Sequence, residues 1–233
     1  MEALVIVLIA LAVVGSIIGG YYVKKKRREE LALAAKQLGL QYSATDQFGL
    51  LGLPFALLSR GEGRGVENVM WGTWQEMAIK EFDYWYYTES TDSKGHTTRS
   101  YSHFSCVVTQ IPAGCAPLTV THEGFFSRLA DHLGFHDIEL ESEEFNKRFQ
   151  VKCQDKKFAT DMLDARMMQW LLGLDGGRSF ELNGPYVMCY SKRLRPLEVT
   201  PLLGTLKGFQ GHIPRVVWDL YGEGGSGKVQ FTG

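Results

Sequence analysis

Residues 3–23 read ALVIVLIALAVVGSIIGGYYV and contain no charged side chain. As a helix this stretch is about 31 Å long, close to the thickness of the hydrocarbon core of a bilayer. Five cations follow it directly, namely Lys24, Lys25, Lys26, Arg27 and Arg28. We therefore expect residues 1–23 to form a transmembrane helix that tethers the rest of the chain to a membrane surface.

The charges around this stretch predict an uncleaved anchor and its orientation. A secretory signal peptide carries its positive charges before the apolar run, whereas only Met1 and Glu2 precede it here. Lysine and arginine collect on the cytoplasmic side of membrane helices. We therefore expect a single pass through the cell membrane, with the N-terminus outside and the C-terminal domain in the cytoplasm.

The cations and two glycines are the candidate membrane residues. At a membrane surface each cation would attract anionic headgroups by about 1 kcal/mol, which predicts membrane-surface roles for Lys24, Lys25, Lys26, Arg27 and Arg28. The alternative is that these residues only set the topology. Gly15 and Gly19 have the spacing that lets two membrane helices approach closely. Membrane lipid is thus the first expected partner, and a homodimer through Gly15 and Gly19 is a second.

The composition of the remaining chain indicates one packed domain that does not bind nucleic acid. Apolar residues make up 45% of the sequence and aromatic residues 12%, which is typical of a chain with a core. Residues 29–233 contain 20 Lys and Arg against 25 Asp and Glu, a net charge of −5. Nucleic-acid binding needs concentrated cations. The four cysteines lack Cys-x-x-Cys spacing, which argues against a zinc ribbon or a thioredoxin-like site.

The order of predicted elements favours an α+β fold with a mostly antiparallel sheet and packed helices, because regular strand–helix–strand alternation is absent. The clearest signals are a helix at 29–38 that continues the anchor, a hairpin of 67–74 and 77–87, and a helix at 156–172. The weaker ones are a strand at 55–58, a polar loop at 88–100, a strand at 101–111 ended by Pro112, a helix at 124–133, a hairpin at Asn183-Gly184, and a last helix from Pro201 that Pro214 splits.

These signals divide the chain into four parts. We expect an anchor at 1–23, a juxtamembrane basic segment and helix at 24–45, an α+β cytoplasmic domain at 46–221, and a flexible glycine-rich tail at 222–233. The tail contains GEGGSGK, the letters of a phosphate-binding loop, but Val229 follows where that loop needs Ser or Thr to hold magnesium. We therefore expect no nucleotide site there.

One cluster of histidines and acids is dense enough to suggest a metal site, namely His122, Glu123, Asp131, His132, His136 and Asp137. Gly134 interrupts the helix face that His132 and His136 would share, and no His-Glu-x-x-His motif is present. Histidines also favour the negative end of a helix dipole. We therefore expect no metal ligand, no cofactor and no catalytic residue.

Four stretches resemble a family of uncharacterised, single-pass membrane-anchored bacterial proteins. They are FDYWYYTES at 82–90, GFFSRLADHLGF at 124–135, EEFNKRFQVKC at 143–153 and LDARMMQWLL at 163–172. The similarity extends from the anchor to about Tyr221. The resemblance implies a bacterial cytoplasmic membrane, and it implies no activity.

The sequence therefore predicts a membrane-tethered cytoplasmic binding or scaffold module with an unknown protein partner. The alternative is a membrane-bound enzyme that uses the cluster of His122, His132 and His136 with its acids, or an aromatic-lined pocket near Tyr84. An exposed apolar patch favours the binding module. Polar groups that converge in one cleft favour the enzyme.

Overall fold

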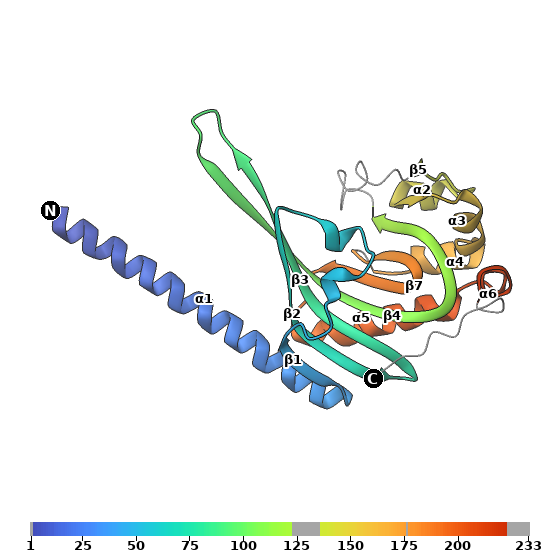
Figure 1. The fold of residues 1–233 in the computed structure, drawn as a ribbon, viewed down its shortest axis with the longest axis horizontal. Helices are drawn as coiled ribbons and strands as arrows, with labels where there is room; N and C mark the ends of the chain where they lie inside the picture. The colour runs from blue at the N-terminus through green and yellow to red at the C-terminus, as the bar shows by residue number, and fades with distance from the viewer. Residues whose placement is uncertain (1, 123–135, 176, 223–233) are drawn as a thin grey trace.

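The structure, a computed structural model, describes residues 2–122, 136–175 and 177–222, with the backbone alone for some residues between 2 and 17. It confirms an α+β fold (Figure 1). The strands are β1 (Gln41–Thr45), β2 (Gly63–Trp74), β3 (Met77–Thr91), β4 (Thr97–His122), β5 (His136–Asp137), β6 (Phe149–Cys153) and β7 (Ser179–Lys192). The α-helices are α1 (Glu2–Leu38), α2 (Glu143–Arg148), α3 (Lys156–Met162), α4 (Ala165–Leu172), α5 (Val199–His212) and α6 (Arg215–Tyr221). Three short 3₁₀ helices are η1 (Leu50–Gly52), η2 (Leu57–Ser59) and η3 (Pro196–Glu198).

The strands form one sheet in the order β1-β2-β3-β4-β6-β5, with β7 on the other edge of β4. Every pair in it is antiparallel. The long strand β4 is the centre, because its first half pairs with β3, its last residues pair with β6, and β7 runs beside it from Phe104 to Val120. The predicted antiparallel sheet is thus confirmed.

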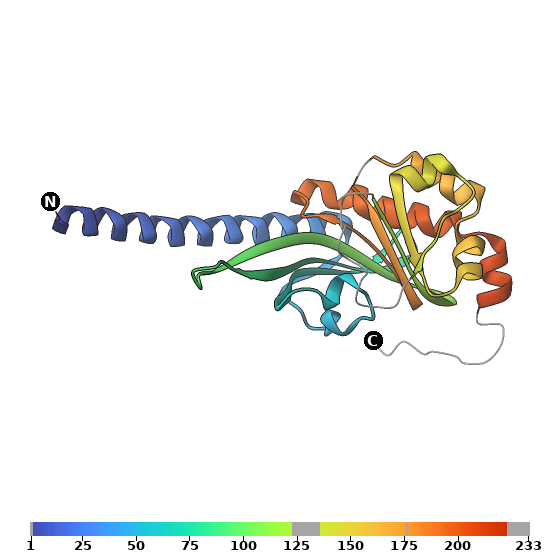
Figure 2. The same ribbon diagram turned by 90° about the horizontal axis from the view of Figure 1, so that it is seen from above.

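Two apolar layers cover the sheet (Figure 2). Helices α3 to α6 and the C-terminal part of α1 lie on one face, where Leu31 and Phe209 are fully buried. On the other face the segment with η1 and η2 packs Phe55 and Leu57 onto Tyr84 of β3. Alternate residues of β3 therefore face different layers, as expected for a strand buried on both sides.

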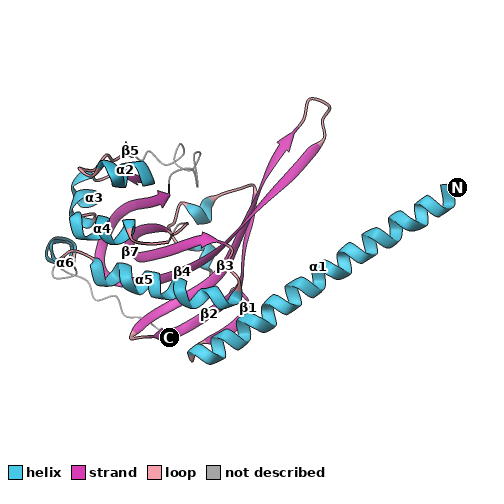
Figure 3. Ribbon diagram, turned by 180° about the vertical axis from the view of Figure 1, so that it is seen from behind, coloured by secondary structure: helices cyan, strands magenta, loops and turns pink. Residues whose placement is uncertain are grey.

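The predicted helix at 29–38 is confirmed as the end of one continuous helix, α1, which has 37 residues. It ends at Gly39, whose φ of 71° is the left-handed conformation that favours glycine after a helix. Figure 3 shows that the C-terminal part of α1 lies along β1 and β2 while its N-terminal part extends away from the sheet.

Within the described residues, no helix combines the length and the apolar character that crossing a membrane requires.

The predicted hairpin around Gln75 and Glu76 is also confirmed. Trp74 pairs with Met77, and the two residues between them have φ values of 47° and 66°. Positive φ at both central positions matches the right-handed twist of the flanking strands. A bulge interrupts the same pair of strands between Glu67 and Met70, and Asn68 has a φ of 56° there.

Strands β3 and β4 are longer than the sequence predicts. The expected polar loop at 88–100 is mostly strand, since β3 runs to Thr91 and β4 begins at Thr97. The expected end of the strand at Pro112 is also wrong. The β4–β7 pairing skips from Gln110 to Cys115. Pro112 therefore lies where β4 is not paired with β7, and its missing amide hydrogen breaks no hydrogen bond to that strand.

The same irregularity explains the wrong prediction of a hairpin at Asn183-Gly184. Gly184 pairs with Cys115, and β7 continues through it without turning back. Its φ of 56° belongs to the bulge rather than to a hairpin turn. A local turn signal thus marks a distortion within a strand.

One helical prediction and one strand prediction need correction, and another helical prediction is confirmed. The expected helix at 156–172 is two helices, because Leu163 leaves the helical conformation and the Asp164 side chain caps α4 by accepting from the amide of Met167. The expected strand at 55–58 is largely the 3₁₀ helix η2. Pro214 does separate α5 from α6, as predicted.

Some predictions concern residues outside the described part. The expected helix at 124–133 and residues 223–233 of the expected tail belong to this group. Gly222 is described, and it forms an isolated bridge with Ala113. Residues 41–45, assigned to the juxtamembrane segment, pair with β2, so the sheet begins before residue 46.

Candidate functional site

The five cations after residue 23 are not equivalent. Lys24 and Arg28 are exposed, and Lys25 and Lys26 lie 3.9 Å from Glu29 and Glu30 one turn further along α1. Such exposed pairs contribute little stability. These four side chains are accessible, as a membrane-surface role requires.

Arg27 differs from the other four, and its predicted membrane-surface role is wrong. Its side chain is only 10% exposed and forms a two-pronged ion pair with Asp83 of β3. Nε lies 2.7 Å from Oδ2, and Nη2 lies 2.5 Å from Oδ1. Burial lowers the pKa of Arg27, but the hydrogen bond and charge of Asp83 outweigh burial and raise it above its ordinary value. The guanidinium is therefore held by the sheet.

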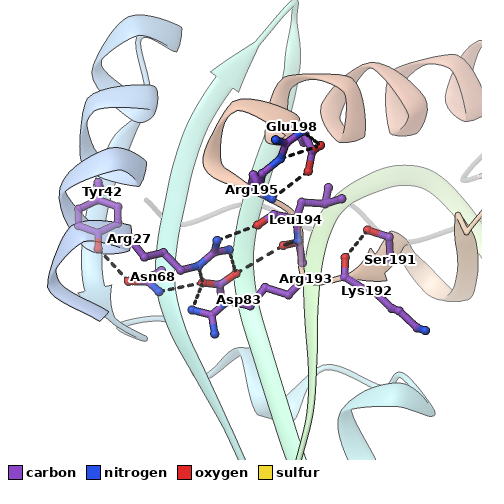
Figure 4. Close-up of polar contacts among 11 residues, drawn as sticks. Arg27, Tyr42, Asn68, Asp83, Ser191, Lys192, Arg193, Leu194, Arg195 and Glu198 are labelled. Atoms are coloured by element: carbon purple, nitrogen blue, oxygen red, sulfur yellow. Dashed lines mark hydrogen bonds and ion pairs between the residues drawn. The ribbon is translucent and has the colours of Figure 1, made fainter. Parts of the chain in front are cut away.

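A wider polar network surrounds this ion pair (Figure 4). Arg27 also donates to the carbonyl oxygen of Leu194 at 2.7 Å. Asn68, at the bulge of β2, donates to Asp83 at 2.8 Å and accepts from the Tyr42 hydroxyl at 2.9 Å. The network thus joins α1, β1, β2, β3 and the segment after β7. We call this network the α1 joint.

Glu81 lies two residues before Asp83 on the same face of β3 and is fully buried. Neither of its carboxyl oxygens has a hydrogen-bond partner within the described residues. Burial and the nearby charge of Asp83 raise the pKa of Glu81 well above its ordinary value, against the opposing effect of Arg27. Burial therefore favours the neutral form of the Glu81 carboxyl.

A second buried carboxyl, Glu181 of β7, lies on the opposite face of the sheet. It accepts from the amides of Ala56 at 2.7 Å and Leu57 at 3.1 Å, which begin η2. Burial raises its pKa to about 7, although these amide bonds lower it. Glu181 lines a cleft of about 270 Å³ together with Pro54 and Asn183. Its amide bonds fold the 54–59 segment onto the sheet.

A second cleft, of about 440 Å³, opens near the β2–β3 turn. Its lining is mixed, with Phe48, Leu50 and Tyr186 beside polar residues such as Glu76 and Gln210. The ammonium group of Lys80 lies 4.9 Å from the centre of the Phe48 ring. This arrangement packs a loop against the sheet, and no reactive pair of side chains lies in it.

The histidine and acid cluster is only partly described. His122 ends β4 and stacks against Phe149 at 4.7 Å, and burial followed by the charge of Arg148 lowers its pKa. His136 begins β5 opposite Cys153. Glu123, Asp131 and His132 lie outside the described residues. Among the residues that are described, no three His, Cys, Asp or Glu side chains are grouped as metal ligands would be.

The aromatic-lined pocket expected near Tyr84 has a counterpart in a cleft of about 470 Å³ that Tyr86, Tyr101 and Phe104 line, although Tyr84 itself is not part of that lining. Tyr84 is fully buried, and its ring packs against Tyr86 and Phe104 at about 6 Å. It lines none of the clefts described above. All four cysteines are buried, and burial raises the pKa of each thiol. A buried cysteine of this kind packs as a small apolar residue.

The anchor glycines lie on the exposed part of α1. A Cβ added at Gly15 or Gly19 would meet no atom within 4 Å.

The α1 joint is the residue set that sequence reasoning missed, and its signals were weak. Arg27 precedes Leu31 and Ala35 at four-residue steps, which places it on their helix face. Both of those residues are buried. Asp83 stands between Phe82 and Tyr84, so it interrupts an aromatic run in a strand. Neither the spacing of Arg27 nor the position of Asp83 in the sequence shows that these two residues pair with each other.

No protein-family profile and no curated protein matches this chain. Among solved structures, it is similar to the crystal structure of the mycobacterial trehalose monomycolate transport factor A, TtfA. The match has a TM-score of 0.60 at 13% sequence identity, and it covers 81% of this chain and 93% of that chain. At this level of sequence identity, the match shows that the two chains share a fold and nothing more.

Proposed function

We propose that this chain is a membrane-tethered binding module, in which the first part of α1 is the anchor and the α+β domain binds a partner on the cytoplasmic side. The observation that carries the proposal is the α1 joint. Arg27 binds Asp83 only four residues after the apolar stretch, within one unbroken helix. A domain joined in this way has no flexible linker to its anchor, so its binding surfaces keep one orientation to the membrane.

The anchor itself is supported by the full sequence of residues 3–23, which includes positions whose side chains the structure does not describe. The stretch has the length and uncharged character of a bilayer span. The exposed cations Lys24, Lys25, Lys26 and Arg28 follow it, and positive charge of this kind favours the cytoplasmic side.

The similar structure supports a role in transport. Its name describes a transport factor for trehalose monomycolate. We extend the proposal accordingly, so that the partner of this module belongs to a transport assembly in the same membrane.

Matched substitutions on α1 test the anchor. Leu11 and Leu33 are both exposed on this helix, at 63% and 57%. Leu11→Lys places a charge in the proposed span, where it costs about 3 kcal/mol, and Leu33→Lys places the same charge beyond the cations. After alkaline carbonate washing, wild type and Leu33→Lys should stay in the membrane pellet and Leu11→Lys should be partly released. Release of the wild-type chain would show that residues 1–23 do not anchor it in the membrane.

The partner is tested separately, by chemical cross-linking in native membranes and mass spectrometry of the products. A membrane transport protein that is cross-linked to the wild-type chain supports the proposal. Products that contain only soluble enzymes would contradict it.

A further inference from the structure

Strands β3 and β4 continue beyond the rest of the sheet as a two-stranded arm, residues 88–103 (Figure 1). The pairing of β2 with β3 stops at Tyr87, and the pairing of β7 with β4 stops at Phe104. β3 and β4 remain paired with each other as far as Thr91 and Thr97. Two strands alone are only marginally stable in water, so the outer edges of the arm are where a further strand would add stability.

The edge of the arm that β3 forms is closed by the chain itself. The amide of Glu62 donates to the carbonyl oxygen of Tyr87 at 3.0 Å, and the Glu62 carboxylate accepts from the amide of Glu89 at 3.3 Å. Tyr87 and Glu89 thus direct their backbone groups away from β4, as alternate residues of a paired strand do. A strand cannot add to this edge without displacing Glu62.

The edge that β4 forms is open. The carbonyl oxygen of His103 accepts from the amide of Arg193 at 3.0 Å, so His103 directs its backbone groups toward β7. The register between β3 and β4 is uninterrupted, and alternation therefore directs the backbone groups of Tyr101, Arg99 and Thr97 to the same side. Among the described residues, none forms a hydrogen bond with the outward amides and carbonyls of these three.

β7 stops where this open edge begins. After Arg193 the chain turns toward α1, because the amide of Leu194 donates to the Ser105 hydroxyl at 3.1 Å and its carbonyl oxygen accepts from Arg27. Among the described strands, none pairs with residues 97–102 on this side. The cleft of about 470 Å³ lies at this end of β7 and is lined from both faces of the sheet, by Tyr86, Ser102, Phe104 and Lys192 on one face and by Tyr101, His103 and Arg193 on the other.

The sequence of residues 97–102 does little to protect the edge. Proteins blunt exposed edges with lysine, proline, bulges or very short strands, whereas these residues read TTRSYS and pair regularly with β3. The one charged residue, Arg99, already pairs with Glu89 of β3 at 2.8 Å. Threonine and tyrosine favour strands. The edge is therefore suited to pairing with another strand.

We propose that the open edge of β4 at residues 97–102 binds an extended segment of a partner protein, which adds to the sheet as an antiparallel strand in line with β7. The inference rests on the proposed function and deepens it, because it names the surface by which the module holds its partner. In strand addition of this kind, main-chain hydrogen bonds give affinity and pockets for alternate side chains give specificity. The cleft at the end of β7 opens on both faces and offers such pockets.

A second copy of this chain does not fit the same edge when both copies are anchored. Antiparallel pairing of two identical edges needs a two-fold axis perpendicular to the strands, which reverses every direction along them. The arm and α1 extend in the same general direction (Figures 1 and 2), so the two copies of α1 would point in opposite directions. The antiparallel strand therefore comes from a different chain.

Peptide binding to the full chain in an uncharged detergent tests the edge. The probe is the acetylated and amidated peptide YYTEST, which repeats residues 86–91, the part of β3 that pairs with residues 97–102. It can place tyrosine opposite Tyr101 and glutamate opposite Arg99, as β3 does. Two control peptides carry N-methyl groups, one on the second, fourth and sixth residues, whose amides would face β4, and one on the first, third and fifth, whose amides would face away.

Amide hydrogen exchange, followed by NMR, is the readout. In the free chain the amides of Arg99 and Tyr101 should exchange fast, and those of Ser100 and Ser102, which face β3, should exchange slowly. The plain peptide and the peptide methylated on its outer amides should slow exchange at Arg99 and Tyr101 about tenfold at about ten times the Kd. The peptide methylated on its inner amides should have no effect. Equal effects of the two methylated peptides, or no protection up to about 1 mM of the plain peptide, would overturn the site.

Proline variants test the partner strand in native membranes. Arg99→Pro and Tyr101→Pro each remove an outward amide of β4, and the control Thr91→Pro removes an outward amide from the opposite edge of the arm. Proline is tolerated where the missing amide faces away from the neighbouring strand. With p-benzoylphenylalanine in place of Thr98, wild type and Thr91→Pro should give the same cross-linked product after illumination. The two β4 variants should reduce its yield about tenfold, the effect of losing main-chain bonds.

The composition of the product and its response to the variants decide the result. A membrane transport protein whose cross-link requires the β4 amides and is displaced by the plain peptide supports the inference. A product made of two copies of this chain, or a link within one copy, would overturn it, as would equal yields from all variants.

Failure of this inference is distinguishable from failure of the proposed function. A chain that resists carbonate washing and cross-links to a transport protein, with no sensitivity to the β4 prolines, keeps the proposed function and loses this edge as the contact. A chain that is washed from the membrane but binds the plain peptide keeps the strand-binding edge and loses the anchor.

Discussion

Arg27 and Asp83 form the contact on which the attachment of α1 to the sheet depends. Both side chains are nearly inaccessible, at 10% and 4% exposure. A buried ion pair of this kind adds little net stability compared with an apolar pair, but removal of one partner leaves an unpaired buried charge. The ion pair also determines the register of α1 on the sheet, because only one position of the helix brings Arg27 to Asp83.

We expect Arg27→Ala to lower the free energy of unfolding by about 3 kcal/mol, because Asp83 would keep its charge with only Asn68, a long hydrogen bond from the Ser105 hydroxyl and the more distant Arg193 as partners. Lys25→Ala is the control, since it removes an exposed ion pair worth at most about 1 kcal/mol. Urea unfolding of both variants in the same detergent measures the difference. Equal stability of the two variants would show that the Arg27–Asp83 ion pair does not hold α1 on the sheet.

Glu81→Met should stabilise the protein. Glu81 is buried between the apolar residues Met70 and Val107 on neighbouring strands, with no hydrogen-bond partner among the described residues for either carboxyl oxygen. Replacing an unsatisfied buried polar group by an apolar one of similar volume recovers about 1–3 kcal/mol. A rise in the urea midpoint at pH 7 is the expected result. A fall would mean that Glu81 has a partner in the folded protein.

Glu181 predicts a dependence of stability on pH. Its folded pKa, about 7, lies above the ordinary value of 4.5, so the folded state binds the proton more tightly than the unfolded state. The stabilisation from Glu181 is therefore complete below about pH 4.5 and is lost as the pH rises through about 7, by about 3 kcal/mol. Glu181→Gln should reduce the fall in unfolding free energy between pH 5 and pH 8. Glu143→Gln, at an exposed side chain, should keep the wild-type dependence.

Trp170 shows how one helix depends on another at the scale of elements. It lies on α4, and its ring packs against Phe180 of β7 and against Phe209 and His212 of α5. Trp170 is partly buried and packs against the core. A Cβ at Gly208 of α5 would stand 2.7 Å from Cζ2 of this ring. The close packing of α4 on α5 thus requires glycine at this position.

A double-mutant cycle tests this contact. Gly208→Ala alone should destabilise the protein by about 1–3 kcal/mol, since the added methyl overpacks the contact with the Trp170 ring. In a Trp170→Ala background, where the ring is absent, the same change should cost nothing or improve the helix, because alanine is the better helix former. The coupling energy comes from four urea titrations. Additive effects would show that the helices do not meet at these residues.

At the scale of the whole molecule, α1 and the arm extend in the same general direction from a two-layered domain (Figure 2). The two layers have separate apolar clusters on opposite faces of the sheet. The α1 joint fixes the helix to the sheet at Asp83 of β3.

A reporter fusion tests the orientation of the whole chain. An enzyme that is active only in the cytoplasm, fused after residue 233, should be active, because the cations that follow residue 23 keep that end inside. Moving the five cations to the N-terminus should reverse or mix the orientation. A reporter that works only in the periplasm can be fused at the same point of the unaltered chain. Its activity would show that the domain does not lie in the cytoplasm.

Local patterns of the sequence were sufficient for elements whose shape depends on near neighbours. The end of α1 at Gly39 and the break at Pro214 follow from backbone preferences of single residues. The hairpin at residues 75–76 follows from the two strand-like runs that flank it, since Gln75 and Glu76 do not themselves favour positive φ. The α+β class follows from the order of such elements. Where local signals were wrong, as at Pro112 and at Asn183-Gly184, a neighbouring strand decided the outcome.

Only the tertiary structure decided which polar residues meet. Arg27 reads as one of five cations, and its pairing with Asp83, 56 residues away, depends on the packing of Leu31 and Ala35 against the sheet. The burial of Glu81 and the open edge of β4 beyond the end of β7 arise in the same way. Charge and hydropathy are properties of a residue, whereas burial and partnership are properties of the folded chain. The sequence by itself determined that the chain has an uncharged stretch, a basic segment and an α+β domain, and the fold determined which of those charges remain accessible.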